Sequence, residues 1–73
     1  MTNPKEYTYV KSSNIMGVMY DKETHDLFVQ FKNGAEYKYN NVAEDDYDAL
    51  ISSPSAGSYF NDNIKDVYSY SRI

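Results

Sequence analysis

The chain has 73 residues and a mass of 8.5 kDa, which allows one small domain with a single hydrophobic core. It has no cysteine, which excludes disulfides and thiolate metal sites, and no stretch approaches the roughly 20 apolar residues of a membrane-spanning helix. Eleven acidic and seven basic residues give a net charge of −4, which disfavours a protein that covers a nucleic-acid backbone.

Residues 1–11 mix polar residues with the segment YTYV, and we expect an N-terminal arm or an edge strand there. A turn at residues 12–14 precedes MGVMYD, a predicted strand. Simple alternation would place Met16, Val18 and Tyr20 on one face of that strand.

A second strand is predicted in DLFVQFK, after a polar connection of hairpin length at residues 21–25. Leu27, Val29 and Phe31 alternate with more polar positions and should face the core. Phe28 is the apolar exception on the opposite face.

Asn33-Gly34 is a strong hairpin signal, because this pair readily adopts the positive φ values of a type I′ turn. The segment AEYKYN should therefore return antiparallel to the second strand. A two-residue turn would put Tyr37 and Tyr39 on the face of Phe28, away from the core. A longer loop or a bulge at Gly34 would shift the pairing by one residue and turn both tyrosines inward. The sequence leaves both registers open.

Two short helices are predicted after the strands. Residues 40–53 carry Tyr47, Leu50 and Ile51 at helical spacing, and Asn41 with Glu44 resembles a capping box. Pro54 separates this helix from a second one, for which Ser55 is the expected N-cap. The second apolar stripe comprises Ala56, Tyr59, Phe60, Ile64, Val67 and Tyr68. The last residues, SYSRI, show no decisive pattern.

The predicted fold is therefore α+β: a small three-stranded antiparallel meander followed by two short helices, with residues 12–73 as a single domain. We expect no enzyme, because His25 is the only histidine and lies in a predicted turn without a nucleophile beside it. No EF-hand loop and no glycine-rich phosphate loop is present, so we expect neither a metal nor a cofactor.

The nine tyrosines are the most distinctive feature of the composition. A tyrosine ring suits both the core of a tiny domain and a half-buried binding surface. A stacking surface for bases would combine the rings of Tyr37, Tyr39 and Phe28 with basic residues. The candidate cations are Lys11, Lys32 and Lys38, with Lys65 and Arg72 added from the second helix and the tail. The alternative is that these rings fill the core.

The stretch VKSSNIMGVMYDKETHDLFVQFKNGAEYKYNNV, together with SPSAGSYFNDNIKDVYSYSR, resembles the KTSC domain family from about Val10 to Arg72. That family is named for the C-terminal region of some lysyl-tRNA synthetases and includes small bacterial and phage proteins. The matching positions are Ser12, Ser13, Ile15, Tyr20, Asp21, Leu27, Val29, Phe31, Gly34, Tyr37, Tyr39, Val42, Tyr47, Leu50, Ser55, Gly57, Tyr59, Phe60, Asn61, Ile64 and Arg72.

The resemblance implies a bacterial or phage protein of the bacterial cytoplasm. It also draws attention to polar matching positions that could line a shared groove, namely Ser12, Ser13, Ser55, Asn61 and Arg72. One hypothesis is a small anion site formed by Arg72 and the two serine turns; the alternative is that these serines cap helices and Arg72 pairs with an acid.

The first functional hypothesis is a non-catalytic adaptor or inhibitor that binds a host protein through a tyrosine-bearing surface. The alternative is RNA or nucleotide binding, with stacking on Tyr37 and Tyr39 and charge from Lys38 and Arg72. No membrane partner is expected, and the oligomeric state is left open.

Overall fold

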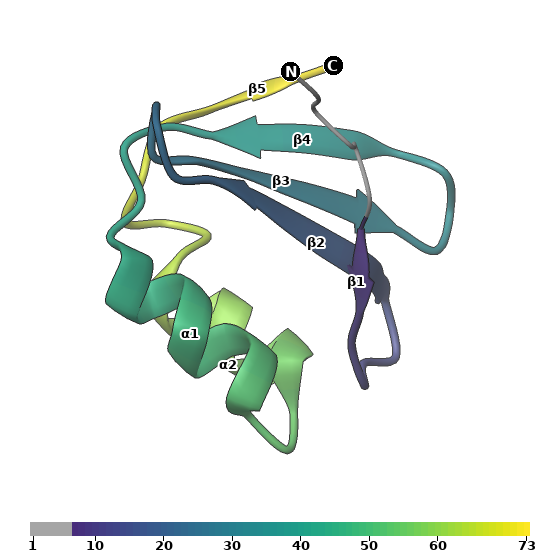
Figure 1. The fold of residues 1–73 in the computed structure, drawn as a ribbon. Helices are drawn as coiled ribbons and strands as arrows, with labels where there is room; N and C mark the ends of the chain where they lie inside the picture. Colours follow the sequence, from purple (N-terminus) through teal and green to yellow (C-terminus); the bar gives the residue numbers. More distant parts are fainter. Residues whose placement is uncertain (1–6) are drawn as a thin grey trace.

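Two layers make up the fold: an antiparallel sheet and a pair of helices against one of its faces (Figure 1). The computed structural model describes residues 7–73. The five strands are neighbours in chain order: β1 (Thr8–Tyr9), β2 (Ile15–Asp21), β3 (Asp26–Phe31), β4 (Glu36–Tyr39) and β5 (Tyr70–Arg72). The helices α1 (Glu44–Ser52) and α2 (Ala56–Asn63) connect β4 to β5.

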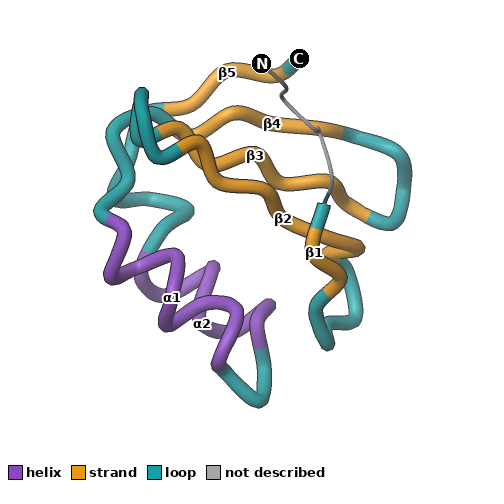
Figure 2. Tube along the Cα trace, in the orientation of Figure 1, coloured by secondary structure: helices purple, strands orange, loops and turns teal. Residues whose placement is uncertain are grey.

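The α+β class is confirmed, and the predicted meander corresponds to β2, β3 and β4. The sheet is larger than predicted, with one further strand on each side (Figure 2). β1 lies within the predicted arm or edge strand, of which residues 1–6 lie outside the described residues. β5 was not predicted, and it returns the chain to pair with β4 after the helices.

A β-bulge in β2 overturns the predicted alternation of that strand. Ile15 pairs with Phe31 and Gly17 pairs with Gln30, so Met16 is an extra residue without a partner across the ladder. Ile15 is fully buried while Met16 is 38% exposed. The prediction that Met16 shares a face with Val18 and Tyr20 was therefore wrong, because the bulge interrupts the alternation before Gly17.

The β3–β4 hairpin has a three-residue loop, not the two-residue turn. The N–H of Gly34 donates to the carbonyl oxygen of Phe31 at 3.0 Å, and the N–H of Phe31 donates to the carbonyl oxygen of Ala35 at 2.8 Å. Gly34 has a φ of 97°, as expected for a turn closed by a glycine bulge. The amide side chain of Asn33 accepts a further bond from the N–H of Ala35 at 3.0 Å.

This loop decides which way the central tyrosines point. Val29 lies opposite Tyr37, and Leu27 lies opposite Tyr39. Since directly paired residues share a face, both tyrosines lie on the core side of the sheet with the predicted inward residues of β3. The longer-loop alternative is the one that the structure contains.

The core lies between this face and the helices. Its buried side chains are Ile15, Val18, Leu27, Val29, Tyr39, Val42, Leu50, Ala56, Phe60 and Ile64. Most were predicted from the strand and helix periods. Val67 was expected in the stripe of the second helix, but α2 ends at Asn63 and Val67 is 63% exposed.

The start of α1 also differs from the prediction. Asn41 has a φ of 56° and lies outside the helix, while Ala43 occupies the N-cap position without a side-chain hydrogen bond. The predicted capping box of Asn41 and Glu44 is therefore wrong. Within residues 7–73, no helix is long and apolar enough to cross a membrane.

Candidate functional site

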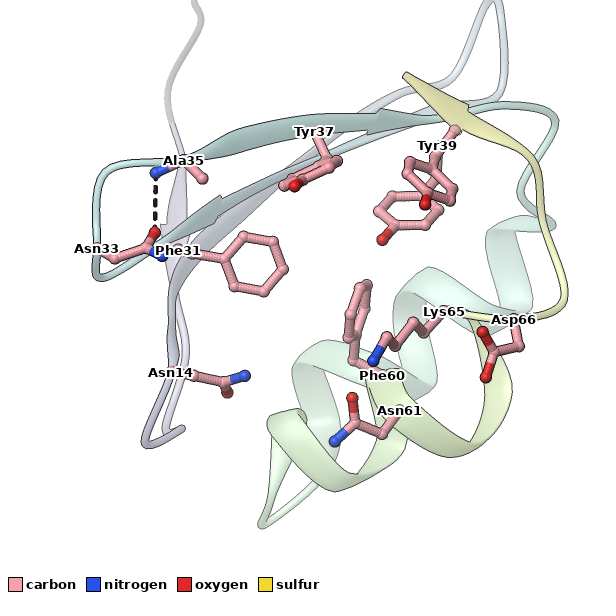
Figure 3. A pocket seen from close by; sticks show the side chains of 11 residues that line it. Asn14, Phe31, Asn33, Ala35, Tyr37, Tyr39, Phe60, Asn61, Lys65 and Asp66 are labelled. Carbon is pink, nitrogen blue, oxygen red and sulfur yellow. Dashed lines mark hydrogen bonds between the residues drawn. The ribbon is translucent and has the colours of Figure 1, made fainter. Parts of the chain in front are cut away.

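Five aromatic side chains surround a cavity of about 300 Å³ between the sheet and α2 (Figure 3). They are contributed by β3, β4, α2 and β5. We call this cavity the aromatic pocket; its rings belong to Phe31, Tyr37, Tyr39, Phe60 and Tyr70.

The rings hold one another in edge-to-face contacts. Phe31 meets Tyr37 at 5.7 Å between ring centroids and at 87°, and it meets Phe60 at 5.8 Å and 73°. Tyr39 meets Phe60 at 5.3 Å and 86°. Such pairs contribute about 0.5–1.5 kcal/mol each beyond simple burial, so the walls of the pocket are pre-organised. Figure 3 shows the rings of Phe31, Tyr37 and Phe60 turned toward one common space.

The three tyrosines of the pocket differ in burial. Tyr39 is only 4% exposed and forms the inner wall, where burial and then the nearby Tyr70 and Tyr37 raise its pKa to about 12. Tyr37 is half-buried, and Tyr70 is 55% exposed at the mouth. The pocket therefore has a closed aromatic wall and an open side.

Polar side chains complete the lining, and they offer both hydrogen-bond donors and acceptors. Three are amides, and the other two carry opposite charges: Asn14, Asn33, Asn61, Lys65 and Asp66. Two of the amide oxygens already accept bonds, from the Ser12 hydroxyl to Asn14 at 2.9 Å and from Ala35 to Asn33. Apolar walls with a few polar groups are typical of a ligand pocket.

Three cationic side chains lie around the aromatic pocket. Lys65 is part of the lining, and Lys32 lines a shallower depression that shares Asn14 and Phe31 with it. Arg72 lies directly opposite Tyr37 in the β4–β5 pair and so on the same face of the sheet. Within residues 7–73 the only ion pair joins Lys22 to Glu44, so these three cations carry no carboxylate partner there.

The structure divides the predicted stacking residues between two faces. Tyr37, Tyr39 and Arg72 share the helix-covered face, as the register with β3 and β5 requires. Phe28 and Lys38 lie opposite each other on the other face of the sheet. Lys38 therefore cannot serve a ligand that is held between the core-side rings.

The two predicted serine turns meet at the start of α2, where their hydroxyls serve local structure. Ser12 Oγ accepts hydrogen bonds from the N–H groups of Asn14 and Ile15 at 3.2 and 3.0 Å. Ser55 occupies the predicted N-cap position, but its hydroxyl donates to Ser58 Oγ at 3.1 Å and not to the helix backbone.

The remaining predicted site residues lie around the pocket. Ser13 lines the shallow depression that borders the aromatic pocket, and Asn61 lines the pocket itself. Arg72 belongs to β5 and to neither serine turn.

Several pocket residues were not predicted as such. Phe31 and Phe60 were expected in the core, and Tyr70 fell in the tail without an assignment. The period-two alternation of Tyr68, Tyr70 and Arg72 was the signal that could have predicted β5. Among the amide and charged groups of the lining, Asn61 and Lys65 had been named from the sequence, whereas Asn14, Asn33 and Asp66 had not been predicted as site residues.

Asp46 connects the helices to the chain that leads into β5. Tyr59 donates to Asp46 Oδ1 at 2.9 Å, and Tyr68 donates to Asp46 Oδ2 at 2.5 Å. These bonds to the carboxylate are the main reason that the pKa of each tyrosine is raised, since ionised phenols could not donate. Tyr68 also accepts a hydrogen bond from the N–H of Ala43. These hydrogen bonds hold the segment that leads to Tyr70, the residue at the mouth of the aromatic pocket.

His25 has a structural place in the β2–β3 turn. It adopts a φ of 65°, its N–H donates to the carbonyl oxygen of Asp21 at 2.8 Å, and its own carbonyl accepts from Val42 at 2.7 Å. The described part of the chain contains no cluster of three or more histidine or carboxylate side chains that could hold a metal ion.

Comparison with known proteins places this architecture in a family. The sequence profile of the KTSC domain matches residues 11–68. An uncharacterized protein of Stutzerimonas stutzeri (strain A1501) is 37% identical over 65 residues, which cover 88% of this chain and 92% of the relative. The crystal structure of a KTSC domain protein from Yersinia pestis superposes with a TM-score of 0.86 at 30% identity, over 93% of this chain and 96% of that one. The chain therefore belongs to the KTSC domain family.

Proposed function

We propose that the chain is a non-catalytic binding module and that the aromatic pocket is its recognition site. The observation that carries this proposal is the set of five rings around an open cavity, which is bordered by amide and charged side chains. Its volume of about 300 Å³ lies at the lower end of the range for ligand pockets, about 300–1,000 Å³. Such a pocket fits one planar group.

The concave shape of the site alters the hypothesis drawn from composition. A tyrosine-bearing surface for a host protein would present rings outward, whereas Tyr39 is buried and Tyr37 forms a wall of the pocket. A recessed aromatic wall favours the capture of a single inserted group over a broad flat contact.

The non-catalytic part of the proposal is supported by the chemistry of the lining. Apart from its tyrosines, the pocket offers Lys65 and Asp66 as titratable groups, and it contains no serine, threonine or histidine. Acyl or phosphoryl transfer needs a nucleophile with an oriented base, or a metal in its place.

The proposal predicts that small planar aromatic fragments bind in the pocket. In a fragment screen by NMR, we expect binders to shift the amide signals of Tyr37, Phe60 and Lys65, since their side chains form the lining. The substitution Tyr37→Leu should weaken these fragments, because it removes the stacking face and retains an apolar side chain.

Phe28→Leu is the matched control, since it changes a ring on the opposite face of the same hairpin. Two results would contradict the assignment of the site. One is that no fragment binds to the wild type, and the other is that fragments bind equally well to the wild type and to Tyr37→Leu.

A protein partner is the second candidate, and exposed apolar side chains favour it. Val67 and Ile73 are 63% and 58% exposed, and they flank the strand that carries Tyr70. An adaptor or inhibitor of phage or bacterial origin would use such exposed apolar side chains in its contact with the partner. Its test is a nuclease-treated pull-down from bacterial lysate, in which Val67→Ser should release the partner and Tyr9→Ser should not.

A further inference from the structure

The cations around the aromatic pocket contrast with the charge of the whole protein. The net charge is −4, yet Lys65 lines this cavity, Lys32 lines the depression next to it, and Arg72 lies on the same face of the sheet. None of the three has a carboxylate partner in the described chain. Asp66 is the single acidic side chain in the lining. This arrangement disfavours a cationic ligand and attracts an anionic group to the open side of the pocket.

The walls select for a flat ring. Tyr37 presents a half-buried ring, and the edges of Phe31 and Phe60 enclose the same space. Stacking on such a wall contributes about 1–3 kcal/mol for a nucleic-acid base. Asn14 and Asn61 add carboxamide groups, which match the mixed donors and acceptors on the edge of a base.

From these features we infer that the aromatic pocket binds a nucleotide, with its base among the rings and its phosphate beside Lys65 and Arg72. The inference rests on the proposed function, for which it names the ligand class. A free mononucleotide and a terminal nucleotide of single-stranded RNA present the same chemistry. An aromatic side chain of a protein would fill the ring site but leave the cations without a counter-charge.

Titration calorimetry with four probes tests this assignment: adenosine monophosphate, adenosine, inorganic phosphate and a short single-stranded RNA. We expect the monophosphate to bind more tightly than adenosine, with a difference that disappears as salt is added. If the RNA binds more tightly than the monophosphate, RNA is the source of the nucleotide; otherwise the free nucleotide is.

Substitutions separate the two parts of the ligand. Lys65→Gln and Arg72→Gln should each weaken the monophosphate up to about fivefold, as for a partly exposed ion pair, and leave adenosine unchanged. Tyr37→Leu should weaken both. Lys38→Gln removes a cation from the opposite face of β4 and should change neither.

Two negative outcomes have different meanings. If no nucleotide probe binds while planar aromatic fragments still bind to wild type and not to Tyr37→Leu, the nucleotide assignment is overturned and the binding-module proposal stands. If neither nucleotides nor fragments bind, both fall. A loss on Lys38→Gln equal to that on Lys65→Gln would also overturn the assignment, because it would place the phosphate elsewhere.

Discussion

Gly57 shows how a single missing atom permits the contact between α2 and the chain before β2. A Cβ at this position would lie 2.8 Å from Ser12 Oγ and 3.2 Å from Asn14 Oδ1. Ser12 cannot move aside freely, because its hydroxyl is bonded to the N–H groups of Asn14 and Ile15. The glycine is therefore needed for close approach, with no positive φ to explain it.

Gly57→Ala is expected to destabilise the protein although alanine favours helices by about 1 kcal/mol. The steric conflict with Ser12 should outweigh that gain, for a net loss of about 1–3 kcal/mol in urea unfolding. Ser12→Ala removes the clashing oxygen, so the double variant should lose less than the sum of the two single losses. Additive losses, or a more stable Gly57→Ala, would show that the turn adapts to the methyl group.

At the scale of elements, local sequence signals predicted which segments form strands and which form helices. They did not predict the register in which the strands pair. The periods of β2, β3, β4 and the two helices follow from single stretches of chain, and all five elements are present. The register of the β3–β4 hairpin depended on whether its loop has two or three residues. Gly34 closes a three-residue loop, and this sets the register. The bulge at Met16 has no local signal, because it exists only in relation to the partner strand.

Asp46 of α1 accepts hydrogen bonds from Tyr59 of α2 and from Tyr68, which lies in the segment before β5. Asp46→Asn leaves one acceptor oxygen for two phenol groups, so either Tyr59 or Tyr68 loses its partner. We expect a loss of about 1–2 kcal/mol in the free energy of unfolding. Because Tyr68 lies two residues before Tyr70, the amide signals of β5 should also broaden or shift in NMR spectra.

Asp45→Asn, an exposed change on the same helix, is the control and should have little effect. Equal losses for both variants would point to the helix dipole and not to the tyrosine bonds.

At the scale of the whole molecule, the candidate site was harder to predict than the fold. The aromatic pocket combines rings from β3, β4, α2 and β5, which lie up to 39 positions apart between Phe31 and Tyr70. Tyr37 and Tyr39 were predicted as site residues from their spacing alone. Lys65 was named only as an added cation on the second helix and Asp66 was missed, because both follow the end of α2, where a continued helix was expected.

The burial and hydrogen bonding of so many tyrosines make the fold sensitive to alkaline pH. The pKa values of Tyr7, Tyr20, Tyr39, Tyr59 and Tyr68 are all raised, that of Tyr39 from 10.0 to about 12. Above pH 10 the unfolded chain therefore loses phenol protons that the folded chain retains, so the free energy of unfolding falls as pH rises. The stability is complete below pH 10 and is lost as the pH approaches about 12.

Tyr39 alone should account for about 3 kcal/mol of this loss, from two pH units at about 1.4 kcal/mol each. A domain of this size has little stability in reserve, so we expect it to unfold within that window. Urea unfolding at a series of pH values, combined with tyrosinate absorbance, measures the effect. Tyr39→Phe keeps the buried ring but removes its ionisation, and its stability should fall less steeply over the same range. A pH dependence that is the same in wild type and Tyr39→Phe would mean that the inner wall of the aromatic pocket is accessible to hydroxide and water, contrary to its 4% exposure.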